Sequence, residues 1–84
     1  MAAPMPDTRT VTVTVTLKNG VLDPQGRAIE SALKGLGFAG VDGARVGKII
    51  ELEVADGTSR ETIEAMAKQL LANTVIENFR IEMP

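Results

Sequence analysis

The chain has 84 residues, a formal net charge of −2, and neither cysteine nor histidine. These absences exclude a disulfide framework, a thiolate nucleophile and the usual proton carrier at neutral pH. The negative charge and the scarcity of aromatic residues argue against a nucleic-acid binding surface. Because no apolar run reaches the length of a membrane span and no signal peptide is recognisable, we expect a cytoplasmic domain without membrane contact.

Residues 1–7 are expected to form a disordered tail, and residues 8–84 a single domain. The first strand is predicted over residues 9–18, where valine and threonine alternate. One of its faces is formed by four threonines: Thr10, Thr12, Thr14 and Thr16. Because a solvated strand face usually includes lysine or glutamate, this face is either an ordinary exposed surface or a site of self-association.

The Asn19-Gly20 pair forms a turn that leads into a helix. Asp23 is a suitable N-cap and Pro24 suits the first helical position, so we predict a helix from Pro24 to about Leu36. Gly37 can supply a left-handed C-cap. The helix has one apolar stripe, formed by Ala28, Ile29, Ala32, Leu33 and Leu36.

Gly26 lies in the first turn of this helix, where glycine costs roughly 1 kcal/mol relative to alanine. Either it is merely tolerated, or it permits another backbone to approach closely. Gln25, Gly26 and Arg27 precede the apolar stripe, so we predict that they contact another subunit. Helix propensity alone would make Gly26→Ala stabilising by roughly 0.5–1 kcal/mol.

The second half of the chain begins with residues 35–40, which match G-x-G-x-x-G. They close a helix instead of opening one, so they do not form a nucleotide loop. Residues 41–55 form a second β region, either a hairpin that turns near Gly47 or one long strand bent there. A second helix follows, with Thr58 as N-cap and Glu61 completing a capping box. Asn73 is a candidate terminator, and residues 79–83 alternate as a last strand.

This order predicts an α+β, two-layer sandwich, β-α-β(β)-α-β, with two helices on one face of an antiparallel sheet and a ferredoxin-like character. No catalytic or metal-binding residue is predicted. Glu51 and Glu53 share one strand face, but they are interpreted as solvated charges, and a carboxylate metal site that includes Asp42 is not expected.

Three stretches resemble the PurS subunit family of phosphoribosylformylglycinamidine synthase. They are residues 17–26 (LK followed by VLDPQG), residues 45–52 (RVGKIIEL) and residues 70–79 (LLANTVIENF). They occur in the family's order, and the resemblance covers nearly the whole chain after the tail.

The resemblance implies a small non-catalytic subunit of an ATP- and glutamine-dependent C–N ligase in purine biosynthesis. Such a subunit joins a glutaminase subunit to a synthetase subunit and supports ammonia transfer between them. ATP and magnesium would belong to the synthetase partner, so this chain would hold no cofactor. We expect a homodimer or a dimer of dimers, because two-fold contacts are the commonest form of self-association.

The candidate partner-interface residues are Asp23, Gln25, Gly26, Arg27, Lys48, Asn73 and Thr74. The candidate self-association residues are the four threonines of the first strand. Two alternatives are an ACT-like regulatory domain that binds a small molecule, which has a similar element order, and a small independent enzyme.

Overall fold

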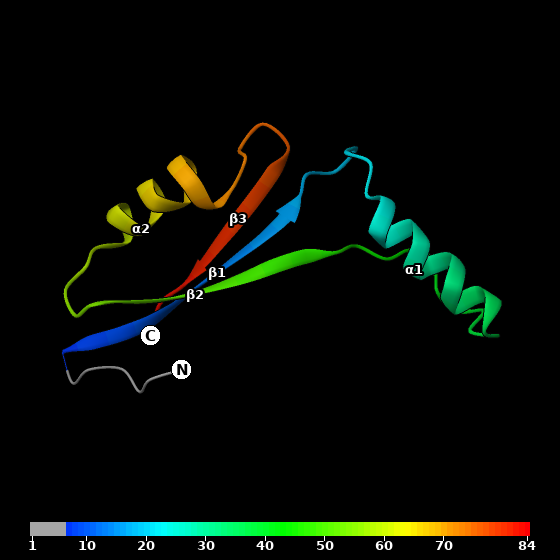
Figure 1. The fold of residues 1–84 in the computed structure, drawn as a ribbon, viewed down its shortest axis with the longest axis horizontal. Coiled ribbons are helices and arrows are strands. Elements are labelled where there is room, and N and C mark those ends of the chain that lie inside the picture. Colours follow the sequence, from blue (N-terminus) through cyan, green and yellow to red (C-terminus); the bar gives the residue numbers. More distant parts are fainter. Residues whose placement is uncertain (1–6) are drawn as a thin grey trace.

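The structure is a computed structural model that describes residues 7–84. Apart from Asp7, the tail predicted at residues 1–7 therefore lies outside the described residues. The elements, in chain order, are β1 (Thr8–Leu17), α1 (Pro24–Gly35), β2 (Gly47–Ala55), α2 (Arg60–Met66), η1 (Ala67–Leu71) and β3 (Glu77–Glu82) (Figure 1). The η1 segment is a π-helical turn that continues α2.

The three strands form an antiparallel sheet in the order β2-β1-β3. β1 is central, and its Val13 lies opposite Ile50 of β2 and Ile81 of β3. The predicted α+β class with an antiparallel sheet is confirmed.

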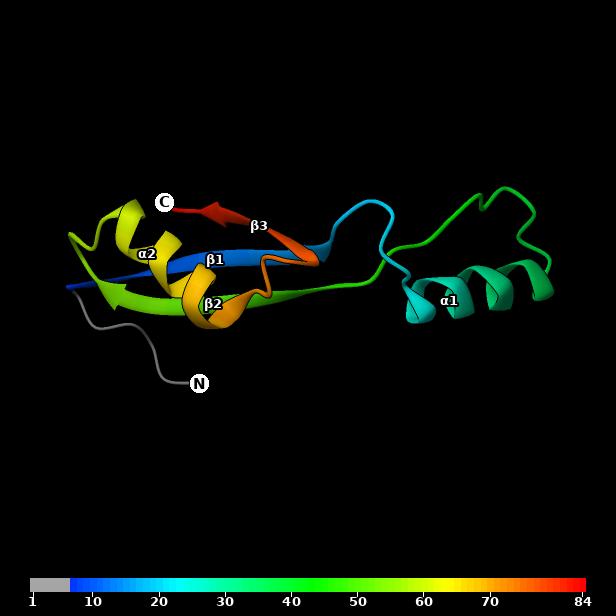
Figure 2. The same cartoon turned by 90° about the horizontal axis from the view of Figure 1, so that it is seen from above.

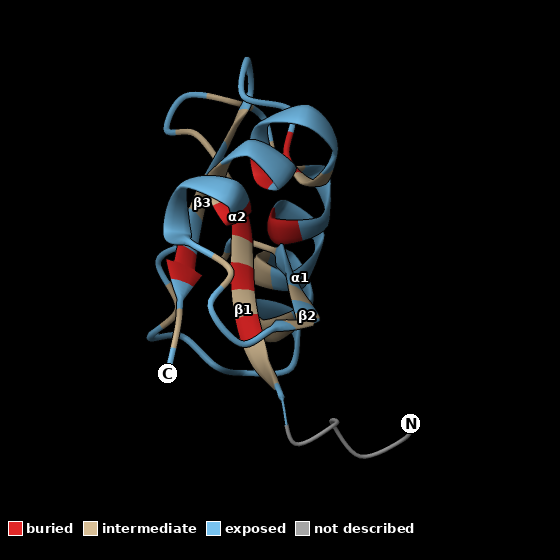
Figure 3. Cartoon of the chain, turned by 90° about the vertical axis from the view of Figure 1, so that its left-hand side faces the viewer, coloured by how far each residue is buried: buried red, intermediate tan, exposed pale blue. Residues whose placement is uncertain are grey.

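The hydrophobic core lies between the valine face of β1 and the α2–η1 helix (Figure 3). The side chains of Val11, Val13 and Val15 are fully buried there, together with Ile63 of α2 and Ala67 of η1. Alternation along the strand therefore supplies one wall of the core, and the helical repeat supplies the other.

Helix α1 lies beyond the end of the sheet instead of on its face (Figures 1 and 2). The radius of gyration is 16.6 Å, whereas a compact domain of this length would have about 12 Å. The predicted placement of both helices on one sheet face therefore holds for α2 alone. An apolar stripe shows that a helix must be covered, but it does not show which chain covers it.

The second β region is neither a hairpin nor a long bent strand. Residues 41–46 are irregular, and a single strand begins at Gly47. A Cβ atom on Gly47 would lie 2.5 Å from the carbonyl oxygen of Val15, so a larger residue would push the first pair of the ladder apart.

The N-cap of α2 is Ser59, one residue later than the predicted Thr58. The hydroxyl of Ser59 accepts the N–H of Thr62 at 3.2 Å. The hydroxyl of Thr58 instead donates to the carbonyl of Ala55 at 2.7 Å, which closes the turn after β2. Thr58 is therefore used by the turn, and the neighbouring hydroxyl becomes the cap.

Candidate interaction site

The carboxylate of Asp23 joins the two chain segments that connect the sheet to α1. Its Oδ1 atom accepts the N–H of Gly26 at 2.8 Å, which caps α1 as the sequence predicts. Its Oδ2 atom accepts the N–H of Val46 at 2.9 Å, from the segment that returns to β2. We call this arrangement of Asp23, Gly26 and Val46 the Asp23 clasp.

The close approach anticipated at Gly26 occurs within the chain itself. Gly26 is buried, and a Cβ atom placed on it would overlap the carbonyl oxygen of Ala44 and come within 2.9 Å of the Asp23 carboxylate. Glycine at this position lets the returning segment lie directly against the first turn of α1. This close contact opposes the gain in stability that helix propensity alone predicts for Gly26→Ala, and we expect the substitution to be destabilising.

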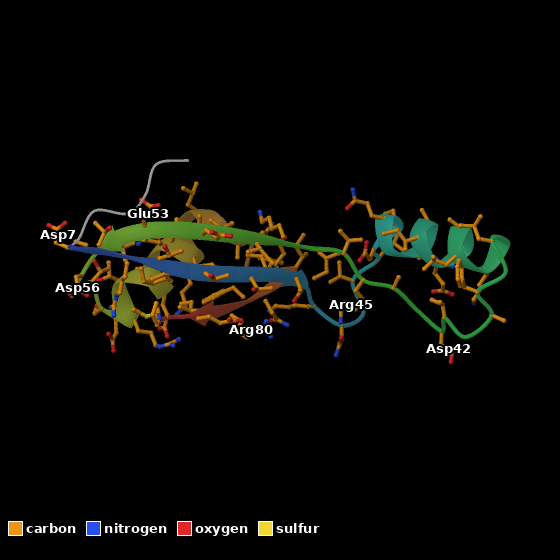
Figure 4. All side chains as sticks on the ribbon, turned by 90° about the horizontal axis from the view of Figure 1, so that it is seen from below. Asp7, Asp42, Arg45, Glu53, Asp56 and Arg80 are labelled. Atoms are coloured by element: carbon orange, nitrogen blue, oxygen red, sulfur yellow. The ribbon has the colours of Figure 1, made fainter. Side chains whose placement is uncertain are left out.

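Arg45, next to Val46, adds further hydrogen bonds between the returning segment and the end of β1 (Figure 4). Its guanidinium donates to the side-chain oxygen of Asn19 at 2.8 Å and to the backbone carbonyl of Leu17. The Arg45 side chain thus ties the returning segment to the end of β1. Sequence reasoning did not name Arg45 as a site residue, although Arg45 begins the stretch of residues 45–52 that resembles the PurS subunit family.

The hydrogen bonds of the clasp lower the pKa of Asp23 below its ordinary value of 3.8. The N–H of Val46 makes the largest contribution, followed by that of Gly26, and the charge of Arg45 acts in the same direction, whereas desolvation opposes them. The carboxylate is therefore charged, and accepts both hydrogen bonds, at neutral pH.

An open groove of about 350 Å³ lies beside the clasp. It brings together three of the predicted partner-interface residues, Asp23, Gln25 and Lys48, and Glu77 also lines it. Arg27 is exposed on α1, outside the groove. The structure thus places three of the seven predicted partner-interface residues around one groove.

Asn73 and Thr74 occupy a separate turn before β3. The backbone N–H of Asn73 donates to the Glu77 carboxylate at 2.7 Å, and the Asn73 side chain accepts the N–H of Val75 at 3.2 Å. These bonds fix a turn in which Val75 is 81% exposed and Thr74 is also exposed. Glu77 lies between this turn and the groove, because it lines both the groove and a second hollow beside Thr74.

The apolar stripe of α1 has little cover from its own chain. Ile29 is 45% exposed and Leu36 is 74% exposed, and Gly26 is the one buried residue of the helix. A second uncovered apolar surface lies beside α2 and η1, where Leu70 is 84% exposed. This surface contains a hollow of about 330 Å³ lined by Leu52, Met66, Gln69, Leu70 and Leu71.

The face of the sheet opposite α2 carries the four threonines of β1. The neighbouring strands add charge at its margins: Thr12 lies opposite Glu51 of β2 and Glu82 of β3. Arg80 and Glu82 form an exposed ion pair at 3.2 Å on this margin. The face is therefore uncharged along its centre only.

Within residues 7–84, no group of three or more acidic, histidine or cysteine residues is arranged to hold a metal ion. In the same described region, none of the helices has the length and apolar character needed to cross a membrane.

The fold defines a small α+β domain in which one amphipathic helix lies off the sheet and is largely uncovered. The family model described as PurS, phosphoribosylformylglycinamidine (FGAM) synthase, matches residues 10–84. The chain belongs to the PurS family, the small subunits of FGAM synthase in purine biosynthesis.

Individual relatives agree with this assignment. The PurS subunit of Synechocystis sp. is 47% identical over 72 residues, which cover 82% of this chain and 72% of the relative. The Bacillus subtilis PurS structure has a TM-score of 0.77 at 44% identity, covering 87% of this chain and 94% of that one. A chain in the PurLQS structure from Thermotoga maritima has a TM-score of 0.76 at 30% identity, covering 93% and 98%.

Proposed function

We propose that this chain is a non-catalytic subunit that joins the glutaminase and synthetase subunits of FGAM synthase and supports ammonia transfer between them. The relative from Thermotoga maritima occurs in a structure named PurLQS, which supports assembly with other subunits. The lack of cysteine and histidine in the sequence supports a role without chemistry of its own. ATP and magnesium would then be bound by the synthetase, and the complex would act in the cytoplasm.

The observation that carries the proposal is the uncovered stripe of α1. A domain this small is marginal even when its helices are packed, and here one amphipathic helix has no sheet beneath it. Burying an exposed leucine or isoleucine completely stabilises a protein by about 1.5–3 kcal/mol. Contact with other chains is the remaining way to gain this free energy.

The proposed first partner is a second copy of the chain, in a homodimer or a dimer of dimers. The stripe of α1 and the hollow beside α2 are both apolar, yet α1 points away from the hollow of its own chain. In a two-fold dimer the α1 helix of each copy would lie against the hollow of the other copy. The dimer would thus contain two equal contacts, and each would cover one apolar stripe and one hollow. The threonine face then remains available for a second self-association contact or for another subunit.

The synthetase and glutaminase would contact the predicted partner-interface residues that remain exposed. The candidates are Gln25 and Lys48 beside the groove, Arg27 on α1, and Asn73 and Thr74 on the fixed turn. A turn held by its own hydrogen bonds loses little conformational entropy on binding, which favours Thr74 and its neighbours as a contact.

The dimer is tested by placing a charge on the stripe. Ile29→Glu should shift the chain to monomer in light scattering at micromolar concentration. Ser31→Glu is the matched control, because it adds the same charge on the exposed opposite side of α1. A dimer unchanged by Ile29→Glu would refute the contact through α1.

The joining role is tested by reconstitution. The chain alone should have no glutaminase or synthetase activity, and adding it to the two partner subunits should restore glutamine-dependent amination. Full glutamine-dependent activity of the two partners without this chain would refute the proposal. Amination with added ammonia measures the synthetase separately and serves as the control.

A further inference from the structure

We infer that Asp23 is a positioning residue that fixes the direction of α1 relative to the sheet, beyond its role as a helix cap. Only two segments connect α1 to the sheet, residues 18–23 and residues 36–46. Among the described residues, direct packing of α1 on the sheet is slight (Figure 2). The orientation of the helix is therefore set by what holds these two segments together.

The Asp23 clasp holds the two connecting segments together at the point where they pass each other. The carboxylate of Asp23, at the end of the first segment, accepts the N–H of Gly26 in the first turn of α1 at 2.8 Å and the N–H of Val46 in the second segment at 2.9 Å. A capping residue needs only the first of these bonds. The second bond, to a residue far along the chain, has no function in helix initiation and joins α1 to the strand that follows it.

The surroundings of the clasp make it a rigid junction. The close approach of Ala44 to Gly26 leaves no room for a side chain between the segments. Arg45 ties the returning segment to Asn19 and to the end of β1. Ala44 thus contacts the first turn of α1, Arg45 the end of β1 and the turn after it, and Val46 the capping residue Asp23. Contacts at three separate points restrict rotation of α1 about the junction.

The consequence for assembly rests on the proposed dimer through α1. If the junction loosens, α1 samples many directions and only a fraction of the molecules present it correctly. Because both copies must present the helix correctly, the apparent dissociation constant of the dimer rises with the inverse square of that fraction. The clasp would therefore tighten assembly without contacting the partner.

The decisive variant is Asp23→Asn. Asparagine has an acceptor oxygen in place of only one of the two carboxylate oxygens, so one of the two bonds is lost. Because asparagine is as good an N-cap as aspartate, we expect the bond from Gly26 to remain and the bond from Val46 to be lost, and unchanged helix content identifies this outcome. The matched control is Glu30→Gln, which removes one negative charge from the same helix away from the clasp.

The direct readout is the distance between α1 and the sheet. Because the chain lacks cysteine, spin labels can be attached selectively at Ser31→Cys on α1 and Glu53→Cys on β2. The distance distribution is measured in the Ile29→Glu background, so that no second copy holds the helix. Asp23→Asn should broaden the distribution while helix content by circular dichroism is unchanged, and Glu30→Gln should leave it narrow.

An equally narrow distribution for Asp23→Asn would overturn the positioning role. The dissociation constant of the dimer is measured separately, without the Ile29→Glu change, and should rise by about a hundredfold if the competent fraction of each copy falls to about a tenth. A broadened distribution with an unchanged dissociation constant would uphold the positioning role of Asp23 and refute the dimer through α1.

Discussion

Gly26→Ala separates helix propensity from packing, because the two effects predict opposite signs at this position. Propensity favours alanine by roughly 0.5–1 kcal/mol. Against this, the new Cβ atom would overlap the carbonyl oxygen of Ala44 and lie 3.0 Å from its carbonyl carbon, and both are backbone atoms. Overpacking of this kind costs about 1–3 kcal/mol. The net result expected is a loss of about 1–2 kcal/mol in the free energy of unfolding.

The assay is urea denaturation followed by circular dichroism, at one fixed protein concentration because association contributes to stability. Gly35→Ala is the matched control: it lies in the same helix, and a Cβ atom there meets nothing within 4 Å. The control should be neutral or slightly stabilised, whereas Gly26→Ala should show a lower midpoint and a melting temperature lowered by about 4–8 °C per kcal/mol. If Gly26→Ala is as stable as Gly35→Ala, the close approach of Ala44 does not constrain the junction.

Three further outcomes are expected. Gly47→Ala should be destabilising, since its Cβ atom would lie 2.5 Å from the Val15 carbonyl oxygen, whereas Gly43→Ala, with nothing within 4 Å, should be neutral in the same urea assay. Ile63→Ala removes a side chain that is fully buried and should lower the free energy of unfolding by about 2–5 kcal/mol. The stabilising effect of Asp23 over Asp23→Asn should be constant above pH 5 and shrink as the pH falls below about 4. Its folded pKa lies below the ordinary 3.8, so the folded state releases that proton more readily than the unfolded state does. A difference in urea midpoint that is as large at pH 3 as at neutral pH would contradict the assigned hydrogen bonds.

The sequence predicted the elements well, because their signals are local. Alternating valines defined β1, and the Asp23-Pro24 pair defined the start of α1. The predicted left-handed residue at Gly37 is also found, with φ of 98°. The cap of α2 was misplaced by one residue because Thr58 and Ser59 both carry hydroxyls, and only the structure shows which of them closes the preceding turn.

The packing could not be predicted to the same extent, because it depends on contacts that are distant in sequence or belong to another chain. The stripe of Ile29, Leu33 and Leu36 indicates a covered helix face equally well whether its own sheet or a second copy lies beneath. The sequence left open whether Gly26 is merely tolerated or permits a close approach, because the group that approaches it, the carbonyl of Ala44, lies in an irregular segment without a periodic pattern. The partner-interface residues therefore remain predictions, although the structure places Asp23, Gln25 and Lys48 around one groove.

The central position of β1 also has a kinetic consequence. Val13 pairs with Ile50 on one side and with Ile81 on the other, so both ladders join residues that are far apart along the chain. Long loops must close before any ladder forms, which places folding in the slow regime of non-local topologies. Until β3 arrives, β1 is an edge strand made of alternating valine and threonine, a segment with high β propensity that can pair with other unfolded chains. Slow refolding with aggregation at high protein concentration is thus a direct cost of placing the first strand in the middle.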